Sequence, residues 1–182
     1  MAKVGTFGEF MLRLGPPGFQ RFEQATNFEV RFGGAEANVA AGLTRMGLSC
    51  DYVTKLPAHA IGQSAVNELR RFGIGTDKIV RGGDRIGTYF VERGAAQRST
   101  QVIYDRKYSA FSLAAVEDFD SDSIFDEDPK YFVFTGISPA LSDEQVEIAK
   151  AAAKKAKENS FFPLTLSCSF AIIYKSSREN FS

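Results

Sequence analysis

Segments typical of buried strands alternate with segments of helical spacing in the N-terminal part of the chain, and this alternation restricts the fold more than any other feature. Short apolar runs occupy residues 3–10, 51–57 and 77–80. Between them, apolar side chains recur at helical spacing in residues 39–46 and 63–72, and each of these two segments is followed by a glycine, which commonly ends a helix. The order strand, helix, strand, helix, strand predicts an α/β sheet covered by helices.

Two longer stretches, residues 10–32 and 86–107, do not fit this alternation. Each resembles a pair of strands separated by a turn that contains glycine or proline. They predict a small antiparallel sheet outside the main sheet. Its apolar residues, such as Phe10 and Phe90, have little chain of their own to cover them, so we expect a homodimer that forms through this sheet.

The C-terminal part first resumes the core pattern and then changes character. Residues 131–137 form another apolar run, and Ser142 to Gln145 have the form of a capping box at the start of a helix. After Glu158, residues 159–182 are rich in serine and phenylalanine and contain one more strand-like run, residues 163–174. We therefore expect one folded unit over residues 1–158 and a divergent tail over residues 159–182.

Composition argues against several functional classes. The 22 basic residues balance the 22 acidic ones, so no overall charge favours nucleic acid or a membrane surface as a partner. The apolar runs are too short to span a bilayer, and two cysteines with one histidine fit neither a disulfide framework nor a zinc site. We expect a soluble cytoplasmic protein without a metal site.

Arginine is unevenly distributed, since eleven of the twelve arginines lie between Phe10 and Lys107. This distribution fits either scattered surface charges or an anionic small-molecule ligand.

Common catalytic and nucleotide-binding motifs are absent as well. The chain contains neither Gly-x-Gly-x-x-Gly nor the P-loop pattern, and the acidic run over residues 118–129 has Pro129 where a calcium loop requires glutamate. The lone His59 has no paired nucleophile in the sequence, which argues against a Ser-His-Asp hydrolase. We therefore predict no catalytic and no cofactor-binding residue in this chain.

Gly33 and Gly34 stand directly before the first helical segment. Glycine lacks Cβ, so this pair permits a close approach of the backbone to a ligand, and a helix N-terminus offers unpaired N–H groups. A phosphate, a carboxylate or a sugar hydroxyl fits such a site equally well.

The strand-like run before Lys107 carries an aromatic and cationic surface. Strand alternation places Tyr104 and Arg106 on one face, and Tyr89 lies on the preceding strand of the same predicted hairpin. Tyrosine packs on sugar carbons and arginine binds carboxylates, so this surface suits a polyhydroxylated anion. An ordinary surface strand explains the same pattern.

Five segments, taken together, resemble the PfkB or ribokinase-like carbohydrate kinases, and among them the 2-keto-3-deoxygluconate kinases most. These segments are GGAEANVA, VTKLP, DRIGTYF, VIYDRKYSA and FTGISPAL. The resemblance covers about residues 4–158 in order. It implies a Rossmann-like core of the ribokinase type with a β-sheet lid over the sugar, and a lid that often joins two subunits.

The resemblance also implies roles for single residues. The pair Gly33 and Gly34 resembles the sugar-binding turn, with Asn38 behind it. Tyr89 and Tyr104 then contact the sugar from the lid, and Arg106 meets the carboxylate of a sugar acid. Ile137 lines the floor of the site, and Glu9 is a weaker candidate for a sugar hydroxyl.

The resemblance ends before the part of the family's sequence that binds the nucleotide. The Asp-x-Asn-x-Arg run and the Gly-Ala-Gly-Asp segment, which supplies the catalytic aspartate, have no counterpart here. Complete relatives use ATP and Mg²⁺, whereas we expect this chain to bind neither productively. The alternatives to a sugar-acid kinase are a kinase for a neutral sugar, such as fructose or ribose, and a non-catalytic sugar-binding or dimerisation module.

Overall fold

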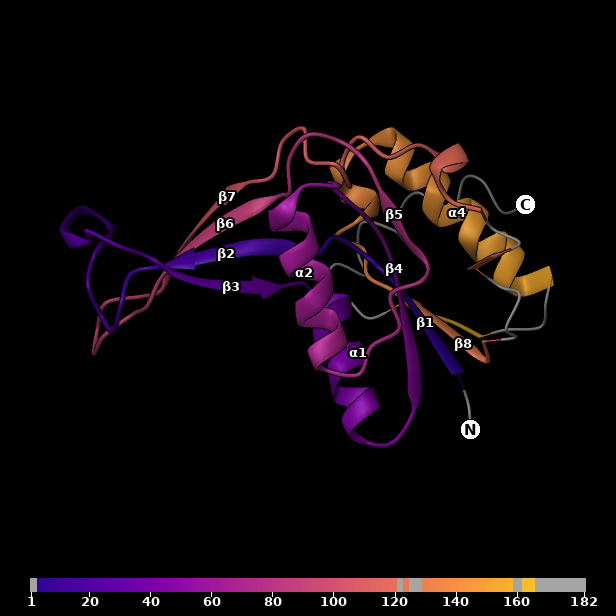
Figure 1. Cartoon of the computed structure of the whole chain (residues 1–182), viewed down its shortest axis with the longest axis horizontal. Coiled ribbons are helices and arrows are strands. Elements are labelled where there is room, and N and C mark those ends of the chain that lie inside the picture. The colour runs from indigo at the N-terminus through magenta and orange to yellow at the C-terminus, as the bar shows by residue number, and fades with distance from the viewer. Residues whose placement is uncertain (1–2, 121–122, 125–128, 159–161, 166–182) are drawn as a thin grey trace.

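The computed structural model describes residues 3–120, 123–124, 129–158 and 162–165 (Figure 1). Its core is a five-stranded parallel sheet in the order β5-β4-β1-β8-β9. The strands are β1 (Lys3–Phe7), β4 (Ser49–Leu56), β5 (Ile79–Arg81), β8 (Tyr131–Phe134) and β9 (Phe162–Thr165). The α/β fold expected from the alternation of segments is confirmed.

Helices cover both faces of this sheet. Alternate residues of its strands belong to two separate apolar clusters, and each cluster includes residues of different helices. Tyr52 packs with α1 (Ala35–Arg45) and α2 (Ala60–Arg71), whereas its neighbour Val53 packs with α4 (Asp143–Glu158). Successive side chains of a strand point to opposite faces, so the two clusters lie on the two sides of the sheet. The core is therefore a three-layer structure, which explains why consecutive residues of β1 and β8 are buried.

Helix ends follow the sequence prediction closely. The backbone of Gly47, after α1, and of Gly73, after α2, has a positive φ of 88° and 75° respectively, the conformation in which glycine is favoured. The capping box before α4 is only half formed. The Ser142 hydroxyl accepts the Gln145 N–H at 3.2 Å, but the Gln145 side chain donates instead to the Phe111 carbonyl at 2.7 Å.

The lid is a second sheet that extends away from the core (Figure 1). Its strands are β2 (Met11–Gly15), β3 (Glu29–Gly33), β6 (Thr88–Glu92) and β7 (Gln101–Asp105), in the order β3-β2-β6-β7. The expected hairpins β2–β3 and β6–β7 are antiparallel, but β2 and β6 pair in parallel. The prediction of a purely antiparallel lid was therefore wrong. The reason is that both strands run outward from the core, and these two outward strands lie side by side.

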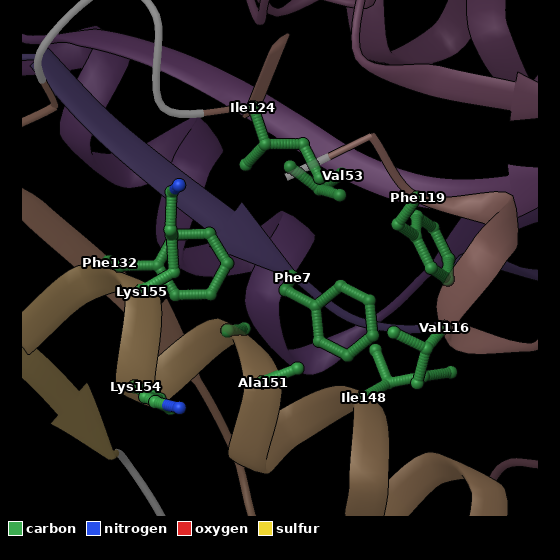
Figure 2. A pocket seen from close by; sticks show the side chains of 11 residues that line it. Phe7, Val53, Val116, Phe119, Ile124, Phe132, Ile148, Ala151, Lys154 and Lys155 are labelled. Atoms are coloured by element: carbon green, nitrogen blue, oxygen red, sulfur yellow. The ribbon is translucent and has the colours of Figure 1, made fainter. Parts of the chain in front are cut away.

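An apolar cavity of about 230 Å³ lies between the sheet and α4 (Figure 2). Phe7, Phe132 and Ile148 line it, and Lys154 and Lys155 lie at its edge. None of the residues predicted to bind sugar contributes to it. This cavity is therefore part of the packing between sheet and helix, and the candidate site lies elsewhere.

The expected strand over residues 163–174 is described only in part. β9 pairs in parallel with β8, and residues 166–182 lie outside the described residues. Within the described part of the chain, no helix has both the length and the apolar character needed to cross a membrane.

Candidate sugar-binding site

The glycine turn joins β3 of the lid to α1 of the core. Gly33 ends β3, Gly34 is the N-cap of α1 with extended backbone, and the Gly34 carbonyl accepts the Asn38 N–H at 3.0 Å. A Cβ at Gly33 would lie 2.6 Å from the Tyr89 hydroxyl, and a Cβ at Gly34 would lie 2.5 Å from the Glu9 carbonyl oxygen. Gly34 is thus required by the packing of the turn against the backbone after β1, whereas Gly33 lies against the tip of a lid side chain.

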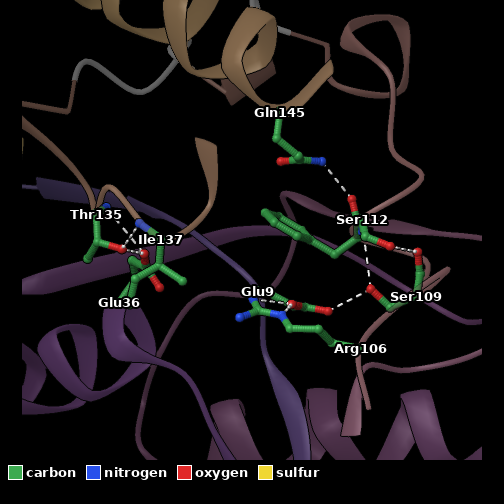
Figure 3. Close-up of polar contacts among 9 residues, drawn as sticks. Glu9, Glu36, Arg106, Ser109, Ser112, Thr135, Ile137 and Gln145 are labelled. Carbon is green, nitrogen blue, oxygen red and sulfur yellow. Dashed lines mark hydrogen bonds and ion pairs between the residues drawn. The ribbon is translucent and has the colours of Figure 1, made fainter. Parts of the chain in front are cut away.

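Glu9 follows β1 and is almost fully buried, with 4% of its surface exposed. Its Oε2 accepts hydrogen bonds from Nε of Arg106, at 2.8 Å, and from Nη2 of the same guanidinium. Its Oε1 accepts the Ser109 hydroxyl at 2.6 Å (Figure 3). The two residues predicted from the sequence to bind sugar are therefore bound to each other, and this ion pair ties the base of the lid to the core.

The lid tyrosines form a cross-strand pair. Tyr89 of β6 lies opposite Tyr104 of β7, and their rings stack with centroids 5.9 Å apart. The guanidinium carbon of Arg106 lies 5.7 Å from the centre of the Tyr104 ring. Burial raises the pKa of Tyr89, an effect that the charge of Arg13 opposes. The aromatic and cationic surface expected from strand alternation is thus present on one face of the lid, and 60% of Tyr104 is exposed on it.

Glu36, in the first turn of α1, is a buried charged residue that the sequence analysis missed. Its Oε1 accepts both the N–H of Thr135, at 3.2 Å, and the Thr135 hydroxyl, at 2.6 Å. Thr135 in turn accepts the N–H of Ile137 at 3.2 Å. One signal was available in the sequence, since Glu36 precedes the buried Ala40 by four residues and therefore shares its helical face.

These groups meet at one edge of the core sheet. Glu9 follows β1, Thr135 and Ile137 follow β8, and Glu36 begins the helix after β3 (Figure 3). Ligands of open α/β sheets bind beyond the carboxyl ends of the parallel strands, which is this edge. Two predicted residues are less enclosed, because Asn38 is exposed on α1 and 44% of Ile137 is exposed. No cluster of side chains suited to a metal ion occurs among the described residues.

Glu36 gives a testable pH dependence of stability. Burial raises the pKa of Glu36 above its ordinary value of 4.5, although the bonds from Thr135 and the charge of Arg106 oppose the shift. A carboxyl whose pKa is raised by folding stabilises the folded state fully below its unfolded pKa, and this contribution is lost as pH rises through the folded pKa. Relative to Glu36→Gln, the wild-type protein should thus become less stable as the pH rises above the ordinary Glu36 pKa of 4.5.

Urea denaturation of both proteins across this pH range checks the expectation. Glu29→Gln, which changes an exposed lid glutamate, is the control and should follow the wild type. A difference between wild type and Glu36→Gln that stays constant with pH would contradict it.

Known proteins match this chain over most of its length. The model of the pfkB family of carbohydrate kinases matches residues 1–172. A 2-dehydro-3-deoxygalactonokinase of Haloferax volcanii is 42% identical over 144 residues, which are 78% of this chain and 44% of the relative. A 2-dehydro-3-deoxygluconokinase of Bacillus subtilis is 29% identical over 140 residues, or 76% of this chain and 43% of the relative.

A solved structure agrees with the observed fold. The crystal structure of a 2-dehydro-3-deoxygluconokinase of Thermotoga maritima superposes with a TM-score of 0.88 at 50% identity, over 91% of this chain and 50% of that one. The chain thus spans about half the length of the relatives that it matches. Since the family model covers nearly the whole sequence, the chain belongs to the pfkB family of carbohydrate kinases.

Proposed function

We propose that this chain is the sugar-binding half of an ATP- and Mg²⁺-dependent kinase for a 2-keto-3-deoxy sugar acid, acting in the cytoplasm. The observation that carries the proposal is the stacked pair of Tyr89 and Tyr104 beside Arg106, held at the glycine turn. Aromatic faces pack on sugar carbons, and a guanidinium binds a carboxylate with two parallel hydrogen bonds. The names of the relatives from Haloferax, Bacillus and Thermotoga support this class of substrate.

The residues have the following roles in this proposal. Tyr89 and Tyr104 cover the sugar from the lid, and Arg106 reads the carboxylate. The backbone at Gly34 approaches the sugar, and Ile137 lines its floor.

A kinase for a neutral sugar is the second candidate, and one observation favours it. The positive charge of Arg106 is already balanced by Glu9, so the site does not require an anionic ligand. Calorimetric titration of the chain with 2-keto-3-deoxygluconate and with fructose separates the two candidates. Tighter binding of the acid supports the first, tighter binding of fructose supports the second, and binding of neither contradicts both.

We expect no phosphoryl transfer by the 182-residue polypeptide itself. A sugar hydroxyl needs a positioned base, and the transferred phosphoryl group needs donors that stabilise its charge. The sequence contains neither a Gly-Ala-Gly-Asp segment nor a P-loop. Incubation with labelled ATP, Mg²⁺ and 2-keto-3-deoxygluconate should yield no labelled sugar phosphate above a blank without protein. Turnover that persists after contaminating kinases are removed would show an ATP site in these residues.

The lid is proposed as a dimer interface. Register pairs place Val30, Leu14, Phe90 and Ile103 in one row across the lid, on the face opposite Tyr89 and Tyr104. Val30 and Ile103 are more than half exposed, at 62% and 52%. Phe10, expected from the sequence to belong to this surface, is instead buried against Phe32 and Tyr52. The two ends of the row, on the edge strands β3 and β7, are therefore the apolar surface available to a second copy.

Charged residues in this row should abolish self-association. In sedimentation experiments at tens of micromolar, we expect the wild type to form dimers and Ile103→Glu to be monomeric, because the charge would be buried without a partner. Met46→Glu, at an exposed position after α1, is the matched control and should still form dimers. A monomeric wild type would exclude the lid interface.

A further inference from the structure

Three groups form a hydrogen-bonded chain between the glycine turn and the loop after β8. The Ile137 N–H donates to the Thr135 hydroxyl oxygen at 3.2 Å, and the Thr135 hydroxyl donates to Glu36 Oε1 at 2.6 Å. The Thr135 N–H donates to the same carboxylate oxygen at 3.2 Å (Figure 3). A hydroxyl has only one hydrogen, so the direction of the chain is fixed from Ile137 to Glu36.

The environment of Glu36 leaves its carboxyl little freedom. Only 3% of the residue is exposed, and the carboxyl fills the space that a Cβ at Gly8 would occupy. Glu36 thus contacts the end of β1 while it holds the end of β8. It is also two residues from Gly34, at the start of the same helix. One side chain therefore connects three of the segments that meet at the candidate site.

We propose that Glu36, acting through Thr135, is a positioning residue that sets where the Ile137 loop lies relative to the glycine turn, and thereby the fit of the sugar. This inference rests on the proposed function, because the loop and the turn are two walls of the proposed sugar site. The Thr135 hydroxyl is the central element, since it is bonded on both sides. Glu36 and Thr135 act through other groups and need not touch the sugar.

The test removes the hydroxyl while the shape of the side chain is kept. In Thr135→Val the Ile137 N–H loses its acceptor and Glu36 keeps only the backbone N–H of residue 135 as a donor from the loop, so the loop is held less firmly to α1. We expect the dissociation constant for 2-keto-3-deoxygluconate to rise about tenfold, a typical effect of removing a buried hydrogen-bond partner. Thr135→Ser keeps the hydroxyl and should bind within about threefold of the wild type.

Glu36 is tested in the same manner. Glu36→Gln keeps an acceptor oxygen at Oε1, so it should retain the chain of hydrogen bonds and bind within about threefold of the wild type. Glu36→Leu keeps the bulk but accepts no hydrogen bond, and it should weaken binding as much as Thr135→Val.

Two further measurements distinguish positioning from a general loss of stability. Val66→Ala removes buried volume from α2, away from the site, and should lower stability without changing the dissociation constant. Hydrogen exchange at the Ile137 amide, which needs no sugar, should be faster in Thr135→Val than in Thr135→Ser.

The outcomes separate this inference from the proposed function. If the wild type binds neither sugar, the proposed function fails, and the exchange rates at Ile137 still report on the hydrogen-bonded chain. If the wild type binds the sugar acid and Thr135→Val binds it equally well, the inference is overturned. If Val66→Ala weakens binding as much as Thr135→Val, the effect is one of stability alone, and the inference is also overturned.

Discussion

Arg106→Ala is expected to lower the free energy of unfolding by about 3–5 kcal/mol, the range for breaking a buried ion pair from one side. Glu9, whose side chain is 3% exposed, would lose its counter-charge and keep only the Ser109 hydroxyl as a partner. Urea denaturation measures the loss. Arg71→Ala is the matched control, because the bridge from Arg71 to Glu68 is exposed and its removal should change stability by less than about 1 kcal/mol.

A double-mutant cycle shows whether the loss comes from the unpaired carboxylate. Adding Glu9→Gln to Arg106→Ala removes the buried charge, so the double variant should be more stable than Arg106→Ala alone. The two side chains would act independently if the double variant were less stable than Arg106→Ala by the full loss of stability that Glu9→Gln causes in the wild type.

The same variant tests the role of Arg106 in recognition. If Arg106 binds the carboxylate of a sugar acid, Arg106→Ala should weaken binding of 2-keto-3-deoxygluconate by about 1.5–3 kcal/mol, as for a hydrogen bond to a charged group. Binding of fructose should change much less. Equal losses for both sugars would assign Arg106 to the ion pair alone.

Gly34→Ala is expected to lower stability by about 1–3 kcal/mol and to weaken sugar binding. The added methyl group would lie 2.5 Å from the Glu9 carbonyl oxygen and 3.3 Å from the Tyr52 hydroxyl, so the turn must move away from β1. The backbone at Gly34 is extended and therefore adds no conformational strain of its own. Thermal unfolding and calorimetry measure the two effects.

Gly42→Ala supplies the control within the same helix. A Cβ at Gly42 meets no atom within 4 Å, and alanine is favoured over glycine inside a helix by up to about 1 kcal/mol. Gly42→Ala should thus stabilise the protein and leave sugar binding unchanged. A Gly34→Ala variant that behaves like Gly42→Ala would show that the turn is not closely packed in solution.

The core and the lid surface could be predicted from the sequence because both depend on local patterns. Helical spacing and terminal glycines locate α1 and α2, and strand alternation places Tyr104 and Arg106 on one face. These patterns are set by residues within a few positions of one another. The same local reasoning predicted the two lid hairpins.

The remaining features depend on contacts between distant segments, which no local pattern reports. The ion pair of Glu9 with Arg106 joins residues 97 positions apart, and the bond from Thr135 to Glu36 spans 99 positions. A carboxylate near a strand end or a helix start is usually solvated, so its burial could not be inferred from its neighbours in sequence. Phe10 was assigned to the lid for a similar reason, since its contacts with Phe32 and Tyr52 exist only after folding.

The parallel pairing of β2 with β6 also determines when the lid forms as the chain is synthesised. Leu12 pairs with Thr88, 76 positions further along the chain. Until β6 has been made, the β2–β3 hairpin is an isolated two-stranded sheet, which is marginally stable in water. Contacts between such distant residues form slowly, because the intervening chain must first be ordered. The lid is therefore expected to assemble late in folding, after β4 and α2 have joined the core, and the sugar site can form only when β7 has brought Arg106 to Glu9.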